Sequence, residues 1–133
     1  MAKVKLGSNA QFGGAGKSLV VIQDRCYAYS GEVSTSDTTE LTVLEFTTGK
    51  YITVIRLQYG SSTGGGVDVK TRAYLNGTTM IEIIHAANYD ENQDAKIPME
   101  LLLPPLSNFK FTIQGQSTQD SDWSVWLHGR LYA

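Results

Sequence analysis

Hydrophobic and polar residues alternate along most of this chain with a period of two, which is the pattern of half-buried β-strands. The alternation runs from about residue 18 to the C-terminus. No segment combines the 3.6-residue period of an amphipathic helix with capping residues. We therefore predict an all-β domain of seven or eight short strands, arranged as an antiparallel sandwich or barrel.

The predicted strands are rich in β-branched and aromatic residues and are separated by polar or glycine-containing segments. They cover residues 19–29, 41–46, 51–59, 67–75, 78–85, 97–103, 109–113 and 123–132. The longer connections between them are expected at residues 31–39, 61–66, 88–94 and 116–122.

Two local features of these strands can be predicted in more detail. Asn76-Gly77 is the preferred pair for a type I′ turn, because both central positions of that turn need a positive φ. Strand 78–85 should therefore pair directly with strand 67–75. The hydrophobic parity also switches at Val43-Leu44, which predicts a β-bulge or a strand that is buried on both faces.

Aromatic and charged residues occupy the polar parity of the last strand. Trp126, His128, Arg130 and Tyr132 alternate with the apolar residues that should face the core. Tyr74 lies on the polar parity of its own strand. Outward aromatic side chains are typical of protein interfaces and of sugar-stacking surfaces, although they can also pack within a domain. We predict that these five residues belong to an interface.

Composition narrows the class of protein. The chain has 133 residues, of which 41% are hydrophobic, so it can form a core without disulfides. Its single cysteine, Cys26, excludes a disulfide framework. A net charge of −2, from 11 basic and 13 acidic residues, argues against a dedicated nucleic-acid-binding protein. No apolar run is long enough for a transmembrane helix, and no signal peptide is expected at the N-terminus.

The first 17 residues differ from the rest because they contain too little apolar material to pack. Lys3, Lys5 and Lys17 lie among small residues and glycines in this segment. We expect residues 1–17 to form a flexible arm that reaches a neighbouring subunit, and residues 18–133 to form the folded domain.

One segment of the arm resembles a phosphate-binding loop but lacks its defining positions. Residues 13–18 read Gly-Gly-Ala-Gly-Lys-Ser. A phosphate-binding loop also needs a glycine five residues before the last of these glycines, and Gln11 occupies that position here. The strand before and the helix after such a loop are also missing, so we predict a glycine-rich hinge and no nucleotide cofactor.

A second segment resembles the start of a calcium-binding loop. Asp90, Asn92 and Asp94 have the alternate spacing of its first ligands, but Ala95 replaces the required glycine and Leu101 the required bidentate glutamate. This excludes an EF-hand, and these three residues remain only weak candidates for a metal site.

The remaining chemistry of the sequence gives no sign of catalysis. His85, His128 and Cys26 are scattered singly, without the paired spacing of metal ligands or a strained nucleophile turn. We therefore expect no enzymatic activity, no metal and no cofactor.

Several short motifs, in order, resemble a known family. They are Ser30-Gly31-Glu32-Val33, Leu44-Glu45-Phe46-Thr47-Thr48-Gly49, Tyr74-Leu75-Asn76-Gly77, Leu101-Leu102-Leu103-Pro104-Pro105-Leu106 and Val125-Trp126-Leu127-His128-Gly129-Arg130-Leu131-Tyr132. Together they resemble single jelly-roll structural proteins of tailed phages, of the kind that decorate or cement a capsid. The resemblance covers roughly residues 28–133 and does not include the arm.

The resemblance implies an eight-stranded antiparallel jelly-roll sandwich without catalytic residues. It also implies a homo-oligomer, commonly a trimer, that binds the major capsid protein on the virion surface after assembly in the host cytoplasm. Nucleic acid and membrane are not expected partners. The alternative is a receptor- or glycan-binding module of a spike or fibre head, and a small β-sandwich enzyme ranks last.

Overall fold

The protein is all-β in the computed structural model, which describes residues 19–35, 38–63, 69–85, 98–116 and 121–133. These residues form nine strands and no helix. The strands are β1 (Val20–Ile22), β2 (Arg25–Thr35), β3 (Leu41–Thr47), β4 (Ile52–Thr63), β5 (Val69–Leu75), β6 (Thr78–His85), β7 (Met99–Leu103), β8 (Asn108–Gly115) and β9 (Ser121–Tyr132).

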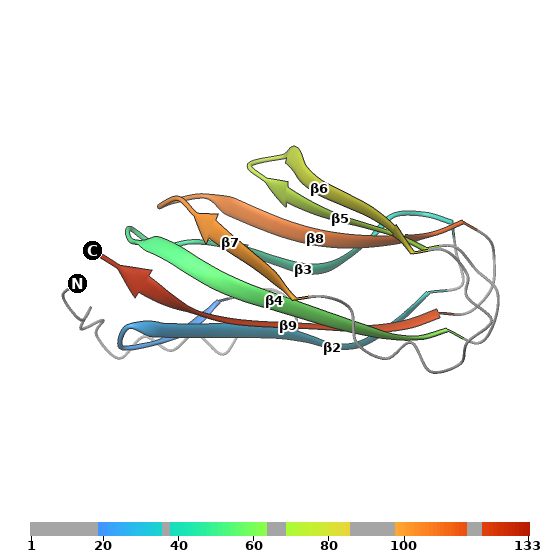
Figure 1. Ribbon diagram of the computed structural model, residues 1–133, viewed down its shortest axis with the longest axis horizontal. Helices are drawn as coiled ribbons and strands as arrows, with labels where there is room; N and C mark the ends of the chain where they lie inside the picture. The colour runs from blue at the N-terminus through green and yellow to red at the C-terminus, as the bar shows by residue number, and fades with distance from the viewer. Residues whose placement is uncertain (1–18, 36–37, 64–68, 86–97, 117–120) are drawn as a thin grey trace.

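The strands form two antiparallel sheets that pack face to face as a sandwich (Figure 1). One sheet has five strands in the order β1-β2-β9-β4-β7, and the other has four in the order β3-β8-β5-β6. Most strands bury one face against the opposite sheet, which is why the period-two pattern dominates the sequence.

The pairing of the strands is nested, and this makes the sandwich a jelly roll. β5 pairs with β6, β4 with β7, β3 with β8 and β2 with β9, all antiparallel, as in a long hairpin folded over on itself. The predicted eight-stranded jelly roll is therefore confirmed for β2–β9, and β1 adds a short ninth strand at the sheet edge.

The first predicted strand is divided into two. A tight turn at Gln23 and Asp24 separates β1 from β2, and the two strands pair as a hairpin. Gln23 has a positive φ of 57°. The sequence pattern missed this turn because it contains neither glycine nor proline, the residues that usually mark such a position.

Strand β2 also continues beyond the point where a loop was predicted. A β-bulge between Tyr29 and Glu32 shifts its register against β9, with Gly31 at a φ of 71°. The Ser30 hydroxyl accepts a hydrogen bond of 3.0 Å from the N–H of Val125 across the bulge. Because one residue is inserted, the outward side chains change from Tyr29 before the bulge to Glu32 after it.

The two detailed local predictions are confirmed. Asn76 and Gly77 have φ values of 50° and 80°, and β5 pairs directly with β6 around them. The register of β3 shifts between Thr42 and Leu44, and Val43 and Leu44 are both buried.

The core lies between the sheets and follows the predicted inward parity. Phe109, Phe111 and Ile113 are fully buried on β8, and Trp123 is 1% exposed at the start of β9. Tyr59 packs against two of these rings, with centroids 5.3 Å from Phe111 and 6.1 Å from Trp123. The alternate residues of β9 therefore point outward, as expected.

Several sequence-based predictions lie outside the described residues. These include the arm with Lys3, Lys5 and Lys17, and the weak metal candidates Asp90, Asn92 and Asp94. In the part of the chain that the structure does describe, no helix is long and apolar enough to span a membrane. The same residues contain no group of three or more potential metal ligands.

Candidate functional site: the outer face of the five-stranded sheet

Four rings stand together on the outer face of β2 and β9, which we call the ring block: Tyr27, Tyr29, Trp126 and His128. Tyr27 is the register partner of His128, and Tyr29 is the partner of Trp126, so the rings occupy two adjacent cross-strand pairs. Cross-strand partners on one face have Cβ atoms about 5 Å apart. The small buried residues Cys26, Ala28 and Ser30 alternate with the two tyrosines and direct them outward.

The rings of the block are parallel along each strand, and all except the half-buried Tyr27 are exposed. The Tyr27 and Tyr29 centroids lie 6.2 Å apart with their planes at 3°, and the Trp126 and His128 centroids lie 5.4 Å apart at 17°. Tyr29 is 61% exposed and Trp126 is 44% exposed. Exposed Trp and Tyr next to one another are typical of the anchor residues of binding surfaces.

Positive charge gathers at one end of the ring block. Arg25 on β2 lies directly opposite Arg130 on β9, and Arg56 on β4 lies opposite His128. Like charges in directly opposed positions destabilise a sheet. Among the described residues, none of the three arginines has an ion pair. We call Arg25, Arg56 and Arg130 the cationic end.

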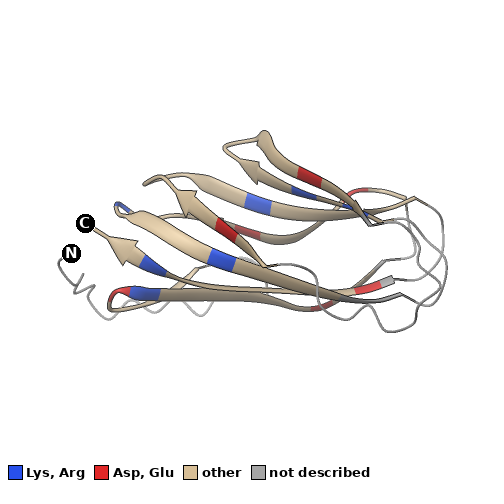
Figure 2. Cartoon of the chain, viewed as in Figure 1, with Lys and Arg blue, Asp and Glu red and all other residues tan. Residues whose placement is uncertain are grey.

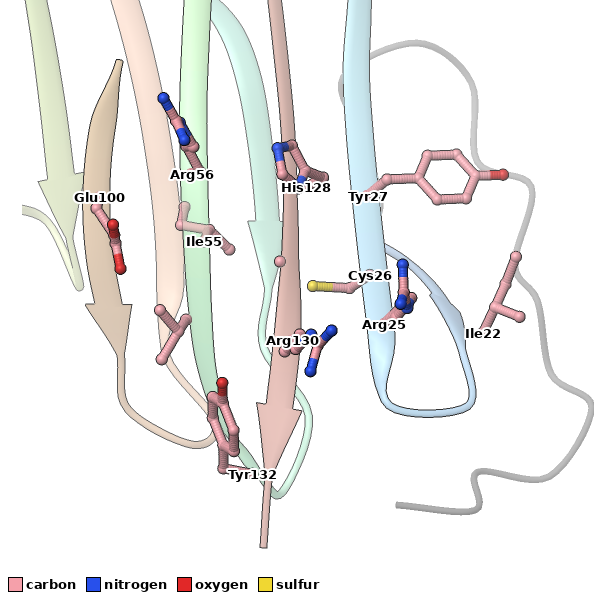
Figure 3. Close-up of a pocket in the computed structure, with 12 residues that line it drawn as sticks. Ile22, Arg25, Cys26, Tyr27, Ile55, Arg56, Glu100, His128, Arg130 and Tyr132 are labelled. Carbon is pink, nitrogen blue, oxygen red and sulfur yellow. The ribbon is translucent and has the colours of Figure 1, made fainter. Parts of the chain in front are cut away.

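The cationic end surrounds an open hollow of about 540 Å³. Figure 3 shows Arg130 on β9 and Arg25 on the neighbouring β2, with the Tyr27 ring directed away from β9 and Tyr132 near the end of β9. Glu100 on β7 is the register partner of Arg56 and is the one carboxylate among the described lining residues.

Two neutral residues of the same strands border this hollow. Gly129 separates His128 from Arg130, and its position has no room for a side chain, because a Cβ there would lie 2.1 Å from the carbonyl oxygen of Val54. Cys26, the register partner of Gly129, is 2% exposed. Burial raises the pKa of its thiol to about 12, so it is not a nucleophile at neutral pH.

Negative charge gathers at the other end of the same face, which we call the acidic end. Glu32 lies opposite Ser124, and Ser34 lies opposite Asp122. The Ser34 hydroxyl donates a hydrogen bond to the Asp122 carboxylate. Figure 2 shows the positive segments of β2 and β9 near the chain's C-terminus and these negative segments toward the opposite end. Asp24, in the β1–β2 turn, is a further acidic residue beside the cationic end.

The opposite face of the sandwich neutralises its own charges. Arg72 donates hydrogen bonds to Glu82 at 2.7 Å and to Gln114 at 2.9 Å, and it forms an ion pair of 3.2 Å with Glu40. Lys70 forms a second ion pair with Glu82. These charged side chains of the opposite face are therefore already compensated within the chain.

Tyr74 belongs to this opposite face and not to the ring block. Its hydroxyl donates a hydrogen bond to Glu40, and the Lys110 ammonium group lies 4.7 Å from its ring centroid. Burial raises the pKa of Tyr74, and the adjacent Glu40 carboxylate raises it further. The interface predicted from sequence is thus split between two faces.

The structure brings the other four predicted residues together and adds to them. Trp126, His128, Arg130 and Tyr132 all lie on the outer face of β9. The prediction missed the two tyrosines of β2 and the arginines at positions 25 and 56. The alternation of Tyr27 and Tyr29 with small residues was a visible signal for outward rings, but their pairing with β9 depends on a contact about 100 residues away along the chain.

No protein-family model matches this sequence, and no curated protein matches it significantly. Several solved structures align with this chain at low sequence identity. VP2 in the subviral particle of infectious bursal disease virus is 15% identical, with a TM-score of 0.50 over 84% of this chain and 34% of that chain. The δ-endotoxin Cry8Ea1 of Bacillus thuringiensis is 12% identical, with a TM-score of 0.46 over 77% of this chain and 20% of that chain.

A family 35 carbohydrate binding module from an environmental isolate also aligns with this chain. It is 12% identical, with a TM-score of 0.35 over 100% of this chain and 85% of that module.

This chain spans only about a third of VP2 and a fifth of the toxin. At these identities the VP2 match shows a common β-sandwich fold and nothing finer.

Proposed function

We propose that this chain is a non-enzymatic structural subunit of a viral particle, which binds its neighbours through the outer face of β2, β9 and β4. One observation carries the proposal: this face carries exposed rings and three arginines that form no ion pair with any described residue, whereas charged side chains of the opposite face form ion pairs with one another. Trp, Tyr and Arg are the residues that contribute most to protein interfaces.

The resemblance to tailed-phage proteins supplies the finer part of the proposal. We propose a decoration or cement subunit that stabilises the phage head by contacts with the major capsid protein on the virion surface. The expected self-association is a homotrimer, assembled in the host cytoplasm. The β-sandwich that this chain shares with the subviral-particle protein VP2 is compatible with such a role.

The direct test measures binding to particles and the role of one exposed ring. We expect the purified chain to co-sediment with cognate heads that lack it, and Trp126→Ala to weaken that binding at least about tenfold, as for an interface anchor residue. Ile84→Ala is the matched control because Ile84 is 60% exposed on β6, in the other sheet. Equal binding by both variants, or no binding by the parent chain, contradicts the proposal.

A second candidate function is supported by the same ring block. Parallel exposed rings are also found on surfaces that bind carbohydrate, so a receptor- or glycan-binding module of a spike or fibre head is the alternative. A glycan array with and without a chelator tests it, and the chelator arm also tests the candidate cation ligands Asp90, Asn92 and Asp94. Binding that Trp126→Ala abolishes supports this alternative, and a silent array counts against it.

A further inference from the structure

We propose that two copies of this chain dock face to face through the ring block, with their strands antiparallel, so that the cationic end of each copy covers the acidic end of the other. The inference rests on the proposed use of this face as an interface. It concerns the chain free in solution, where a second copy occupies this face in a two-fold dimer instead of the homotrimer that the phage resemblance implies. The observation that supports the inference is the distribution of charged residues along β2 and β9.

The charges on β9 are placed symmetrically about Trp126. Arg130 and Asp122 lie four residues to either side of it, and all three share the outward parity of the strand. At about 3.3 Å per residue, each charge lies about 13 Å from the tryptophan position along the strand. A rotation that reverses the strand about Trp126 therefore exchanges the positions of Arg130 and Asp122.

Strand β2 repeats this arrangement because of its bulge. Arg25 lies opposite Arg130, Tyr29 lies opposite Trp126, and Ser34 lies opposite Asp122. The bulge after Tyr29 is what brings Glu32 to the outer face, beside the acidic end of β9. Both strands thus run from cation through ring to acid in the same direction across the face.

A two-fold axis in the plane of the interface, crossing the strands at the Tyr29–Trp126 row, uses this pattern. It places Arg130 of one copy over Asp122 of the other, and each such contact occurs twice, as in any isologous interface. The two Trp126 side chains then meet at the centre. Sheets that pack face to face lie about 10 Å apart, which side chains of this size can fill.

The alternative orientation is disfavoured by the same charges. If the second copy were turned about an axis that runs along the strands between β2 and β9, Arg25 of each copy would lie over Arg130 of the other, and the acidic ends would also coincide. Like-charge contacts of this kind discriminate strongly against a wrong docking mode. The hollow between Arg25 and Arg130 gives the partner's acidic side chains a recess in the antiparallel mode.

A charge-exchange experiment tests this directly. Arg25→Glu with Arg130→Glu makes both ends of the β2–β9 pair acidic, and Glu32→Lys with Asp122→Lys makes both ends basic. We expect the parent chain to self-associate in sedimentation equilibrium, and each double variant alone to associate at least about tenfold more weakly because like charges then meet. An equimolar mixture of the two variants should recover a heterodimer, which added salt weakens.

Two controls separate loss of contact from loss of fold. Arg25, Glu32 and Arg130 are exposed and Asp122 is half-buried, and thermal unfolding of each variant shows whether it is folded. Adding Trp126→Ala to both partners of the mixture should remove the heterodimer, whereas Ile84→Ala on the opposite sheet should not. Recovery that survives Trp126→Ala would reflect general attraction between acidic and basic proteins, and it would overturn the proposed docking.

The outcome can be separated from that of the proposed function. A parent chain that is monomeric but binds particles through Trp126 overturns the face-to-face docking and leaves the structural role intact. Charge exchange that restores the dimer, without any binding to particles, supports the docking and removes the structural role. A self-association that neither double variant weakens overturns the docking.

Discussion

Gly129 packs so closely against the backbone of Val54 that a Cβ at position 129 would lie 2.1 Å from the Val54 carbonyl oxygen and 2.9 Å from the Cα of Ile55. Both contacts involve backbone atoms of the paired strand β4, which cannot move aside as the end of a flexible side chain can. Gly129 lies between His128 and Arg130, so this contact also sets the distance between β9, which carries Arg130, and β4, which carries Arg56.

We expect Gly129→Ala to destabilise the fold by about 3 kcal/mol, because the added methyl group must push β4 and β9 apart. Urea unfolding followed by tryptophan fluorescence measures the change. Gly49→Ala is the matched control, since a Cβ at position 49 has no atom within 4 Å and should leave the unfolding midpoint unchanged. Equal midpoints for the two variants would contradict the close approach.

The buried hydroxyl of Thr48 joins two connections at one end of the sandwich. It donates a hydrogen bond of 2.7 Å to the Pro104 carbonyl and accepts one of 2.8 Å from the N–H of Ser107. Thr48→Val keeps the shape of the side chain but leaves that N–H without its acceptor, so we expect a loss of about 1–3 kcal/mol in the free energy of unfolding. Thr48→Ser retains the hydroxyl, so its loss in the free energy of unfolding should be clearly smaller than that of Thr48→Val.

The carboxylate of Glu40 should make stability depend on pH. Partial burial alone would raise its pKa, but hydrogen bonds from Thr112, Tyr74 and Arg72 together outweigh burial and lower the pKa below the usual 4.5. Because the folded-state pKa is lower, the contribution of Glu40 to stability is present above the unfolded-state pKa and is lost as the pH falls through the folded-state value.

We therefore expect the stability difference between the parent chain and Glu40→Gln to be constant near neutral pH and to shrink as the pH falls from about 5 to about 3. Urea unfolding across this range provides the measurement. Glu45→Gln is the control, because Glu45 lies outside the network around Arg72. A stability difference that does not change with pH would contradict a lowered folded-state pKa for Glu40.

The Cys26 thiol should be unreactive in the native protein. With a pKa of about 12, only about one thiol in ten thousand is ionised at pH 8, and the side chain is also 2% exposed. We expect a thiol-specific disulfide reagent to modify native Cys26 only as fast as the protein unfolds, and to modify it rapidly in denaturant. Rapid labelling without denaturant would mean that the β2–β9 pair opens locally.

Much of the fold could be predicted because short-range pattern determines it. The alternation of Phe109, Phe111 and Ile113 and the Asn76-Gly77 turn each depend on neighbouring residues only. The turn at Gln23 could not be predicted, because its positive φ is imposed by the pairing of β1 with β2 rather than by glycine. The bulge at Gly31 was likewise hidden, because it exists only against β9.

The sequence by itself determined that hydrophobic and polar residues alternate along this chain. It also determined that one side of a strand carries Trp126, His128, Arg130 and Tyr132. It showed that no motif for nucleotide or EF-hand calcium binding is complete. Only the tertiary structure decided which side chains are neighbours. The pairing of β2 with β9 joined Tyr27 and Tyr29 to that row, and the two-sheet arrangement placed Tyr74 on the opposite face. The physical reason is that alternation is a local property of the backbone, whereas strand register is set by contacts between residues far apart in the chain.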